Sequence, residues 1–389
     1  MNMSEQNLFV VNHSTRAIFG VGTHAQSGSV LRGWGCKRAL CVCDPVIWQL
    51  GIADRVGRSI EQENIEVVWF DQVASDPTSD LVDRVGTLGR EAKVDCVVGI
   101  GGGSTLDTAK GANLLLSNPG TIADYIGVNR GKRPIEKKIP LLLMPTTAGT
   151  SAEITPVFVV THSETKQKTG ASNRGDTAII DPTFALDLPA HVTAATGIDM
   201  LAHVTESLIN PKPHWLSEAM DELVISLVFR NLPIAYDNGH DLHARTQLAY
   251  ACMIAGYAFA DKGTYLGHAV ADRISNRFHS SHGVGCALGL PVALRYAIKA
   301  HPEKVRRISA AIGLNPDLPH GELAQSLLDA YRTLQRRIGL KSMKEMGLDQ
   351  QFISFVASDL HHDVRFQNNP YAPNYSLAKE ALFEEFSFG

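Results

Sequence analysis

The stretch "VVGIGGGSTLDTAK", residues 97–110, joins a short β-branched run to a glycine run and then to a helical pattern. Three of its glycines are consecutive, Gly101, Gly102 and Gly103. A strand that enters a helix through such a turn presents backbone N–H groups at the helix N-terminus, where the helix dipole favours a phosphate. Glycine also lets the backbone approach a ligand closely. The stretch therefore predicts either a phosphate-binding turn or a tight turn without a ligand.

The glycine spacing differs from two common phosphate-binding patterns. In the dinucleotide fingerprint G-x-G-x-x-G, counted from Gly99, the last glycine would fall on Ser104. In a P-loop a lysine directly follows a glycine, whereas Lys110 lies seven residues beyond Gly103. Neither fingerprint is present, and the motif alone leaves both interpretations open.

The chain up to about residue 188 alternates strand-like and helical segments. The strand-like runs are apolar without alternation, as expected for strands covered on both faces. Residues 78–93 predict a helix opened by a Ser or Thr cap, and residues 157–172 predict a hairpin. This order predicts an α/β domain with a mainly parallel sheet. The predicted strands are residues 38–44, 65–70, 95–100, 139–145 and 177–182.

The second half of the sequence has a different pattern, in which long helical segments dominate. The proline-bearing stretch near 182–189 suggests a boundary. We therefore expect an α/β domain over 1–188 and an all-helical domain over 189–389. A cleft between two such domains is a common place for ligands.

Composition excludes several classes of partner. The chain has 389 residues, 44% of them apolar, and a formal net charge of -4, which argues against nucleic acid or an anionic membrane as the main partner. No run approaches the roughly 20 apolar residues of a membrane span. The first residues lack the pattern of a secretory signal. The six cysteines show no C-x-x-C pair, so we expect buried thiols in a reducing cytoplasm.

Asp44 ends the predicted strand 38–44 and offers a second indication of a nucleotide. A carboxylate at a strand end can accept hydrogen bonds from a ribose diol, and it would repel the 2'-phosphate of NADP. This favours NAD over NADP. Aspartate before Pro45 is also a common turn initiator, so the residue type alone does not decide.

A possible metal-ligand set lies in the helical half. Asp199 and His203 stand at i and i+4, on one face of a helix. The segment 266–291 adds His268, His279 and His282. A mixed set of carboxylate and imidazole suits Fe(II), Zn or a similar divalent ion. Any one of these histidines alone would more often cap a helix or lie at the surface.

Together these motifs resemble the iron-containing alcohol dehydrogenases, the group III, metal-dependent family. The resemblance runs nearly from end to end. It rests on "FGVGT" (19–23), "KRALCVCD" (37–44), "GIGGGSTLDTAK" (99–110), "PTTAGTSAE" (145–153), "IIDP" (179–182), "TAATGIDMLAHVTES" (193–207) and "HGVGCALGLP" (282–291).

The resemblance implies a dehydroquinate synthase-like fold, with a dinucleotide-binding α/β domain and an all-α metal-binding domain. It implies hydride transfer between NAD(P)H and a carbonyl. The metal, Fe²⁺ or Zn²⁺, would be held by Asp199, His203, His268 and His282, and the 14-residue spacing of the last two excludes His279. The cofactor would contact Asp44 at the ribose, Gly101, Gly102, Gly103, Ser104 and Asp107 near the pyrophosphate, and Thr146 and Thr147 near the nicotinamide.

The chain departs from the family pattern near its active site. The usual "HAxAHxLG" reads "HAVADRIS", so Asp272 replaces a histidine that often relays a proton or shapes the pocket. Asp272 could relay a proton, bind a substrate hydroxyl or contact a neighbouring arginine. We count it with His268 as a candidate catalytic residue. Arg273 and Arg277 follow closely and could admit an anionic aldehyde, although they could also lie on a solvated helix face.

The resemblance thus predicts an NAD(H)-linked alcohol dehydrogenase or aldehyde reductase acting on a small alcohol or aldehyde, as at least a homodimer. Three alternatives stay open. The substrate could be an anionic aldehyde that carries a carboxylate, sulfonate or phosphonate. The protein could be a lyase similar to dehydroquinate synthase, which uses NAD transiently. It could also bind NAD without turnover.

Overall fold

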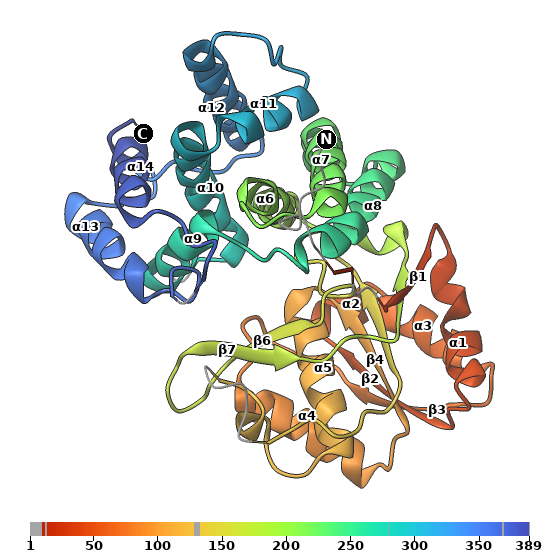
Figure 1. The fold of residues 1–389 in the computed structure, drawn as a ribbon. Helices are drawn as coiled ribbons and strands as arrows, with labels where there is room; N and C mark the ends of the chain where they lie inside the picture. The colour runs from red at the N-terminus through yellow and green to blue at the C-terminus, as the bar shows by residue number, and fades with distance from the viewer. Residues whose placement is uncertain (1–9, 12–13, 128–132, 279, 368, 389) are drawn as a thin grey trace. The chain divides into compact units, whose positions relative to one another are not determined.

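The computed structural model describes residues 10–11, 14–127, 133–278, 280–367 and 369–388. Residues 1–9, which enter the argument against a secretory signal, lie outside these ranges. The chain forms two compact units: one holds the described residues from 14 to 187, and the other holds residues 10–11 and those from 188 onward (Figure 1).

The first unit is built on a six-stranded sheet in which every pair of neighbours is parallel. The strand order is β1-β8-β5-β4-β2-β3. The five predicted strands are all present. The sequence patterns missed the edge strand β1, which pairs with β8 over only four residues. The strands are β1 Arg16–Phe19, β2 Arg38–Cys43, β3 Glu66–Phe70, β4 Cys96–Gly101, β5 Leu141–Pro145 and β8 Thr177–Ile180.

Helices cover both faces of this sheet, which explains why its strands are apolar without alternation. On β2, Cys41 and Cys43 pack in one core cluster with residues of α1 (Ser27–Gly33) and α3 (Ile52–Glu61). Leu40 and Val42 point the other way and pack with residues of α4 (Ser79–Glu91) and α5 (Gly103–Ser117). None of the six cysteines, all of them described, forms a disulfide.

Two local predictions for the first unit are confirmed. Thr78 caps α4, and its hydroxyl accepts a hydrogen bond from the Leu81 N–H at 3.3 Å. β6 (Val157–Thr161) and β7 (Lys168–Ser172) form the expected antiparallel hairpin. The polar turn between two strand-like runs produced this signal.

The second unit is helical throughout its regular elements. No helix in the described ranges is both long and apolar enough to span a bilayer. The helices are α6 Ala190–Ile209, α7 Trp215–Asp237, α8 Leu242–Phe259, α9 Leu266–Phe278, α10 His282–Ala300, α11 Pro302–Ala311, α12 His320–Arg337, α13 Gln350–Asp359 and α14 Tyr375–Phe388 (Figure 1).

Glycines bring α6, α9 and α10 into backbone contact. A Cβ on Gly283 of α10 would lie 2.0 Å from the Ala195 carbonyl oxygen of α6. A Cβ on Gly289 of α10 would lie 2.1 Å from the Gly267 carbonyl oxygen of α9. Only glycine fits at such crossings. The three helices therefore converge closely enough for short side chains from each to meet.

Candidate cofactor site and metal centre

The glycine run lies at the point where the order in which strands are added to the sheet reverses. After β2 the chain places β3 on one side, and it then returns to place β4 on the other side. In open α/β sheets, ligands bind at such a switch point, outside the carboxyl ends of the strands. Asp44 follows β2 directly, and Gly101 ends β4. The topology thus brings together two features that lie more than 50 residues apart in sequence.

Packing explains two of the three consecutive glycines. A Cβ on Gly101 would lie 2.6 Å from the Thr105 Cβ, and one on Gly103 would lie 2.9 Å from the Thr150 Cγ2. Both glycines are therefore explained by packing within the protein. A Cβ on Gly102 would meet nothing nearer than Thr147 Cγ2 at 3.4 Å. The fold leaves space at Gly102, the N-cap of α5, where no side chain caps the helix.

Asp44 has two roles within the protein. Its Oδ1 accepts hydrogen bonds from the N–H groups of Val46 at 2.9 Å and Ile47 at 3.2 Å, and so caps α2 (Pro45–Gln49). Its Oδ2 accepts a bond of 3.3 Å from the Thr105 hydroxyl in the first turn of α5. The turn-initiating interpretation is confirmed. The ribose contact stays a prediction, at a carboxylate that lies beside the glycine run.

Of the other predicted cofactor residues, three lie near the glycine run and one faces the hairpin. Thr146 donates its N–H to the Gly101 carbonyl at 3.0 Å, and Thr147 lies opposite Gly102, so both lie beside the glycine run. Ser104 lies in the first turn of α5. Asp107 instead accepts a bond of 3.0 Å from the Val159 N–H of the hairpin.

Lys110 also faces the hairpin rather than the glycine run. Its buried ammonium donates to the carbonyl groups of Thr155 and Val157, both at 2.8 Å. Burial lowers the pKa of Lys110 to about 8 and raises that of Asp107 to about 6, although each charge partly offsets the effect on the other. This pair anchors the hairpin to α5.

The metal-ligand candidates converge around one carboxylate of α6. Oδ1 of Asp199 lies 3.7 Å from Nδ1 of His203, 3.7 Å from Nε2 of His268 and 3.6 Å from Nε2 of His282. Asp199, His203 and His268 are buried, and His282 is partly exposed. Burial alone would raise the pKa of Asp199, but the neighbouring imidazoles outweigh it and hold the carboxyl well below its usual pKa. His279, excluded by spacing, lies outside the described residues.

His203 carries an unused nitrogen. Its ring stacks on Phe259 with centroids 4.3 Å apart, and its buried Nδ1 has no hydrogen-bond partner among the described residues. Burial lowers the pKa of His203 to about 3 against the opposing attraction of Asp199. A buried polar atom left unpaired is costly. A neutral imidazole with an available lone pair beside a carboxylate fits a metal ion, so the residues present are consistent with the expected centre.

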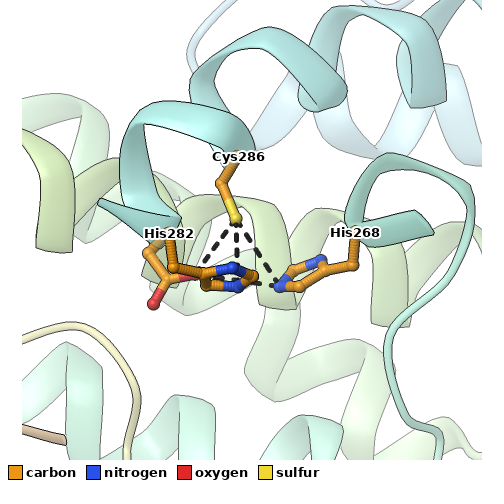
Figure 2. Close-up of side chains that lie close together, drawn as sticks. His268, His282 and Cys286 are labelled. Carbon is orange, nitrogen blue, oxygen red and sulfur yellow. Dashed lines mark hydrogen bonds and ion pairs between the residues drawn. The ribbon is translucent and has the colours of Figure 1, made fainter. Parts of the chain in front are cut away.

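Cys286 belongs to the same cluster, which the sequence interpretation missed. Its sulfur lies 3.2 Å from Oδ1 of Asp199, 3.5 Å from Nε2 of His282 and 3.8 Å from Nε2 of His268. Figure 2 shows both imidazole rings directed at the sulfur. The donor atoms of these four residues all lie within 4.8 Å of one another. The available signal was the i, i+4 spacing of His282 and Cys286 on one helix.

Glu206 is a second residue that the sequence interpretation did not single out. Its fully buried carboxylate lies 2.9 Å from Nδ1 of His268. A carboxylate on one ring nitrogen of a histidine leaves the other to face a metal. Glu206 follows Asp199 by seven residues and His203 by three, which places all three on one face of α6.

Asp272 contacts an arginine, as one of the three alternatives predicted, but one distant in sequence. Its Oδ2 accepts a bond of 3.1 Å from Nη1 of Arg365, and its Oδ1 lies 3.6 Å from Nδ1 of His282. Arg365 also donates to Asp363. Arg273 is mostly buried and is not available for a ligand, because it pairs with Asp359 and Asp363, both at 2.8 Å. Arg277 is exposed.

Comparison with known proteins decides the family. The family model described as iron-containing alcohol dehydrogenase matches residues 14–182. The model of the C-terminal domain of the Fe-containing alcohol dehydrogenase family matches residues 193–382. The chain is an iron-containing alcohol dehydrogenase. Members of this family are oxidoreductases acting on CH–OH groups, and iron and NAD are the cofactors that the comparisons support.

This alcohol dehydrogenase has curated relatives along nearly its whole length. It is 31% identical over 356 residues to a choline dehydrogenase of Bacillus subtilis, covering 90% of this chain and 88% of the relative. It is also 31% identical to an NAD-dependent methanol dehydrogenase of Bacillus methanolicus, covering 91% and 93% of the two chains.

Solved structures resemble this alcohol dehydrogenase equally broadly. A 1,3-propanediol oxidoreductase superposes with a TM-score of 0.90 at 29% identity, covering 97% of this chain and all of that one. A sulfoacetaldehyde reductase from Bifidobacterium kashiwanohense in complex with NAD+ superposes with a TM-score of 0.88 at 26% identity, covering 98% and 100%. The parallel α/β unit followed by a helical unit is thus the fold of these enzymes.

Proposed function

We propose that this chain interconverts a small neutral alcohol and its aldehyde, with NAD(H) bound at the switch point and a divalent metal held by Asp199, His203, His268 and His282. The observation that carries the proposal is the convergence of three imidazoles, those of His203 and His268 buried, on one buried Asp199 oxygen. Removed from water, such donors are stable together only when a cation or protons neutralise the carboxylate.

Each cofactor contributes one chemical capability. The metal, when bound, is a Lewis acid toward the substrate oxygen, and the nicotinamide carries the hydride. The residues of the chain position these groups. Glu206 holds His268 with Nε2 toward the cluster, and Asp272 lies against the outer nitrogen of His282. Asp272 is partly exposed, so its carboxylate can also exchange a proton with solvent.

The preference for NAD over NADP rests on Asp44. Its carboxylate is held in place by two backbone N–H groups and by the Thr105 hydroxyl, so it cannot easily turn away from an incoming ribose. A 2'-phosphate there would meet a fixed negative charge. We expect kcat/KM with NADH to exceed that with NADPH, and Asp44→Asn to narrow the difference.

The charges near Asp272 favour a neutral substrate. Arg273 and Arg365 share three carboxylates, those of Asp272, Asp359 and Asp363. These arginines therefore present no unbalanced positive charge to an anion. Because a sulfoacetaldehyde reductase is among the similar structures, an anionic aldehyde is the second candidate substrate. Steady-state rates with neutral and anionic aldehydes of equal chain length, each with NADH, will distinguish the two.

Removal of His268 tests the catalytic proposal. We expect His268→Ala to lose metal content and turnover together while NAD binding, measured by calorimetry, persists. His243→Ala, at an exposed position of α8, is the matched control. Full activity of His268→Ala without bound metal would contradict the mechanism. Metal analysis of the wild-type protein identifies the native ion in the same experiment.

We also propose that the enzyme is at least a homodimer in the cytoplasm. The family resemblance supports the assembly, and the absence of a disulfide among the six cysteines agrees with a reducing compartment. Size-exclusion chromatography with light scattering measures the assembly directly. A mass of 42.2 kDa, that of one chain, would refute it.

A further inference from the structure

We propose that Cys286 supplies a thiolate ligand to the metal of this centre, and that the sulfur shifts the preference of the centre from iron toward zinc. The inference rests on the proposed metal site and adds a donor to it. The family pattern implied only carboxylate and imidazole ligands.

The distances around the sulfur are those of ligands that share an ion. With about 2.3 Å from zinc to sulfur and about 2.0 Å to nitrogen or oxygen, tetrahedral neighbours lie roughly 3.3–3.6 Å apart. The sulfur lies 3.2, 3.5 and 3.8 Å from its three neighbours. Asp199 Oδ1 lies 3.6 and 3.7 Å from the two Nε2 atoms. One oxygen, two nitrogens and one sulfur thus lie close enough to bind one ion, beside the His203 ring of the proposed site.

When the two rings are neutral, three acceptor atoms converge on the sulfur. The Glu206 carboxylate, 2.9 Å from Nδ1 of His268, accepts the proton of that nitrogen, so in the neutral ring Nε2 is an acceptor. A thiol has one proton to donate, whereas Asp199 Oδ1 and the Nε2 atoms of His268 and His282 all face the sulfur. A cation among these atoms satisfies them at once.

Cys286 lies in a tightly packed part of the helical unit. The side chain is 1% exposed, one helical turn after His282 on α10. The adjacent Gly285 would bring a Cβ to 2.2 Å from the Ser275 Oγ of α9, which shows how tightly α10 packs there. The sulfur thus lies buried beside the donors of α6 and α9.

Thiolate chemistry predicts the metal preference. On binding, the thiol releases its proton to solvent and the sulfur donates its electron pair to the ion. Soft sulfur ligands favour zinc over harder ions, relative to sites with only oxygen and nitrogen. The enzyme should therefore bind zinc more tightly, compared with Fe(II), than a variant that lacks the sulfur.

Cobalt(II) tests for the sulfur bond without relying on activity. Metal-free protein is titrated with Co²⁺ while the absorption spectrum is recorded. We expect visible d–d bands together with a near-ultraviolet thiolate-to-cobalt charge-transfer band. Cys286→Ser should keep the d–d bands and lose the charge-transfer band. Cys252→Ser, at a buried cysteine of α8 outside the cluster, should keep both.

The cobalt titration distinguishes failure of the Cys286 ligand from failure of the metal site. Cobalt binding to the wild type without the charge-transfer band overturns the role of Cys286 and leaves the metal site standing. Failure of Co²⁺ to bind overturns the metal site itself, and the thiolate with it.

A second measurement uses only the wild-type chain for its main readout. Zinc should protect one thiol, identified as Cys286 by mass spectrometry, from alkylation in mild denaturant, and equal alkylation with and without zinc would overturn the proposal.

The metal preference is measured by competition. When metal-free protein is mixed anaerobically with equal amounts of zinc and Fe(II), the bound zinc-to-iron ratio should be at least about tenfold lower in Cys286→Ser than in the wild type. An unchanged ratio would contradict the predicted metal preference.

Discussion

Oε1 of Glu206 lies 2.9 Å from Nδ1 of His268, and the same imidazole turns its Nε2 toward Asp199 and Cys286. The carboxylate therefore fixes both the proton and the orientation of a ligand ring from behind. Glu206 also accepts a hydrogen bond from the Tyr265 N–H at the start of α9, so it ties the ligand helix to α6.

Glu206→Gln should weaken metal binding while the fold is retained. The amide keeps the size of the side chain but removes the negative charge that makes His268 a better donor. We expect zinc affinity, measured by competition with a chelator, to fall roughly 10–100-fold. Glu222→Gln, on α7, serves as the control because Glu222 pairs with Arg307 away from the cluster. Unchanged affinity in Glu206→Gln would refute this role.

Asp272→Asn should lower kcat/KM by roughly 10–100-fold without changing the Kd for NAD. Asparagine cannot hold Arg365 by charge, and it weakens the contact with Nδ1 of His282. A concurrent loss of metal affinity identifies a positioning residue. Unaltered metal affinity with the loss of one limb of the pH–rate profile identifies a proton carrier. Asp359→Asn, which loosens Arg273 and His362 but leaves the Asp272 pair intact, is the control; no effect in Asp272→Asn would exclude both roles.

Gly102→Ala should weaken NAD binding with little loss of stability. The backbone at Gly102, with φ −77° and ψ −175°, suits alanine, and the new methyl would meet only Thr147 at 3.4 Å. We expect the Kd for NAD to rise about tenfold or more, the cost of crowding a close contact. Gly99→Ala provides the contrast, because its Cβ would lie 2.7 Å from that of Ala109. That variant should lose about 1–3 kcal/mol of stability. Normal NAD affinity in Gly102→Ala would place the pyrophosphate elsewhere.

Glu218 should make the stability of the helical unit depend on pH. Burial alone would raise its pKa, but Lys304 at 2.6 Å, Lys262 at 3.3 Å and Arg307 outweigh burial and hold the pKa below its ordinary value of 4.5. Because the folded pKa is depressed, the stabilisation is complete above pH 4.5 and is lost as the pH falls through the folded value.

Glu218→Gln should therefore lower the free energy of unfolding by about 3 kcal/mol at pH 7, since it removes the carboxylate that Lys262, Lys304 and Arg307 share. The difference from the wild type should shrink below pH 4.5. Urea unfolding followed by circular dichroism from pH 3 to pH 7 measures both. Glu222→Gln, at a partly exposed pair, should have a much smaller effect at every pH. A difference between Glu218→Gln and the wild type that does not vary with pH would contradict this account.

The sequence by itself determined the elements and half of the site. Strands 38–44 and 95–100 follow from unbroken apolar runs, and Asp199 and His203 follow from a spacing of four residues. These signals lie within a few positions of one another, so local backbone geometry is enough to interpret them. The resemblance to a known family then grouped candidate ligands that lie far apart in the sequence.

Only the tertiary structure decided which side chains meet. Glycine crossings bring α6, α9 and α10 together, and this packing places Cys286 beside Asp199, 87 residues away in sequence. Arg365 reaches Asp272 across 93 positions. Packing against Thr105 and Thr150 explains why residues 101 and 103 are glycine. No such packing explains the glycine at Gly102. Contacts of this kind arise from the shape of the packed core, which no local spacing encodes.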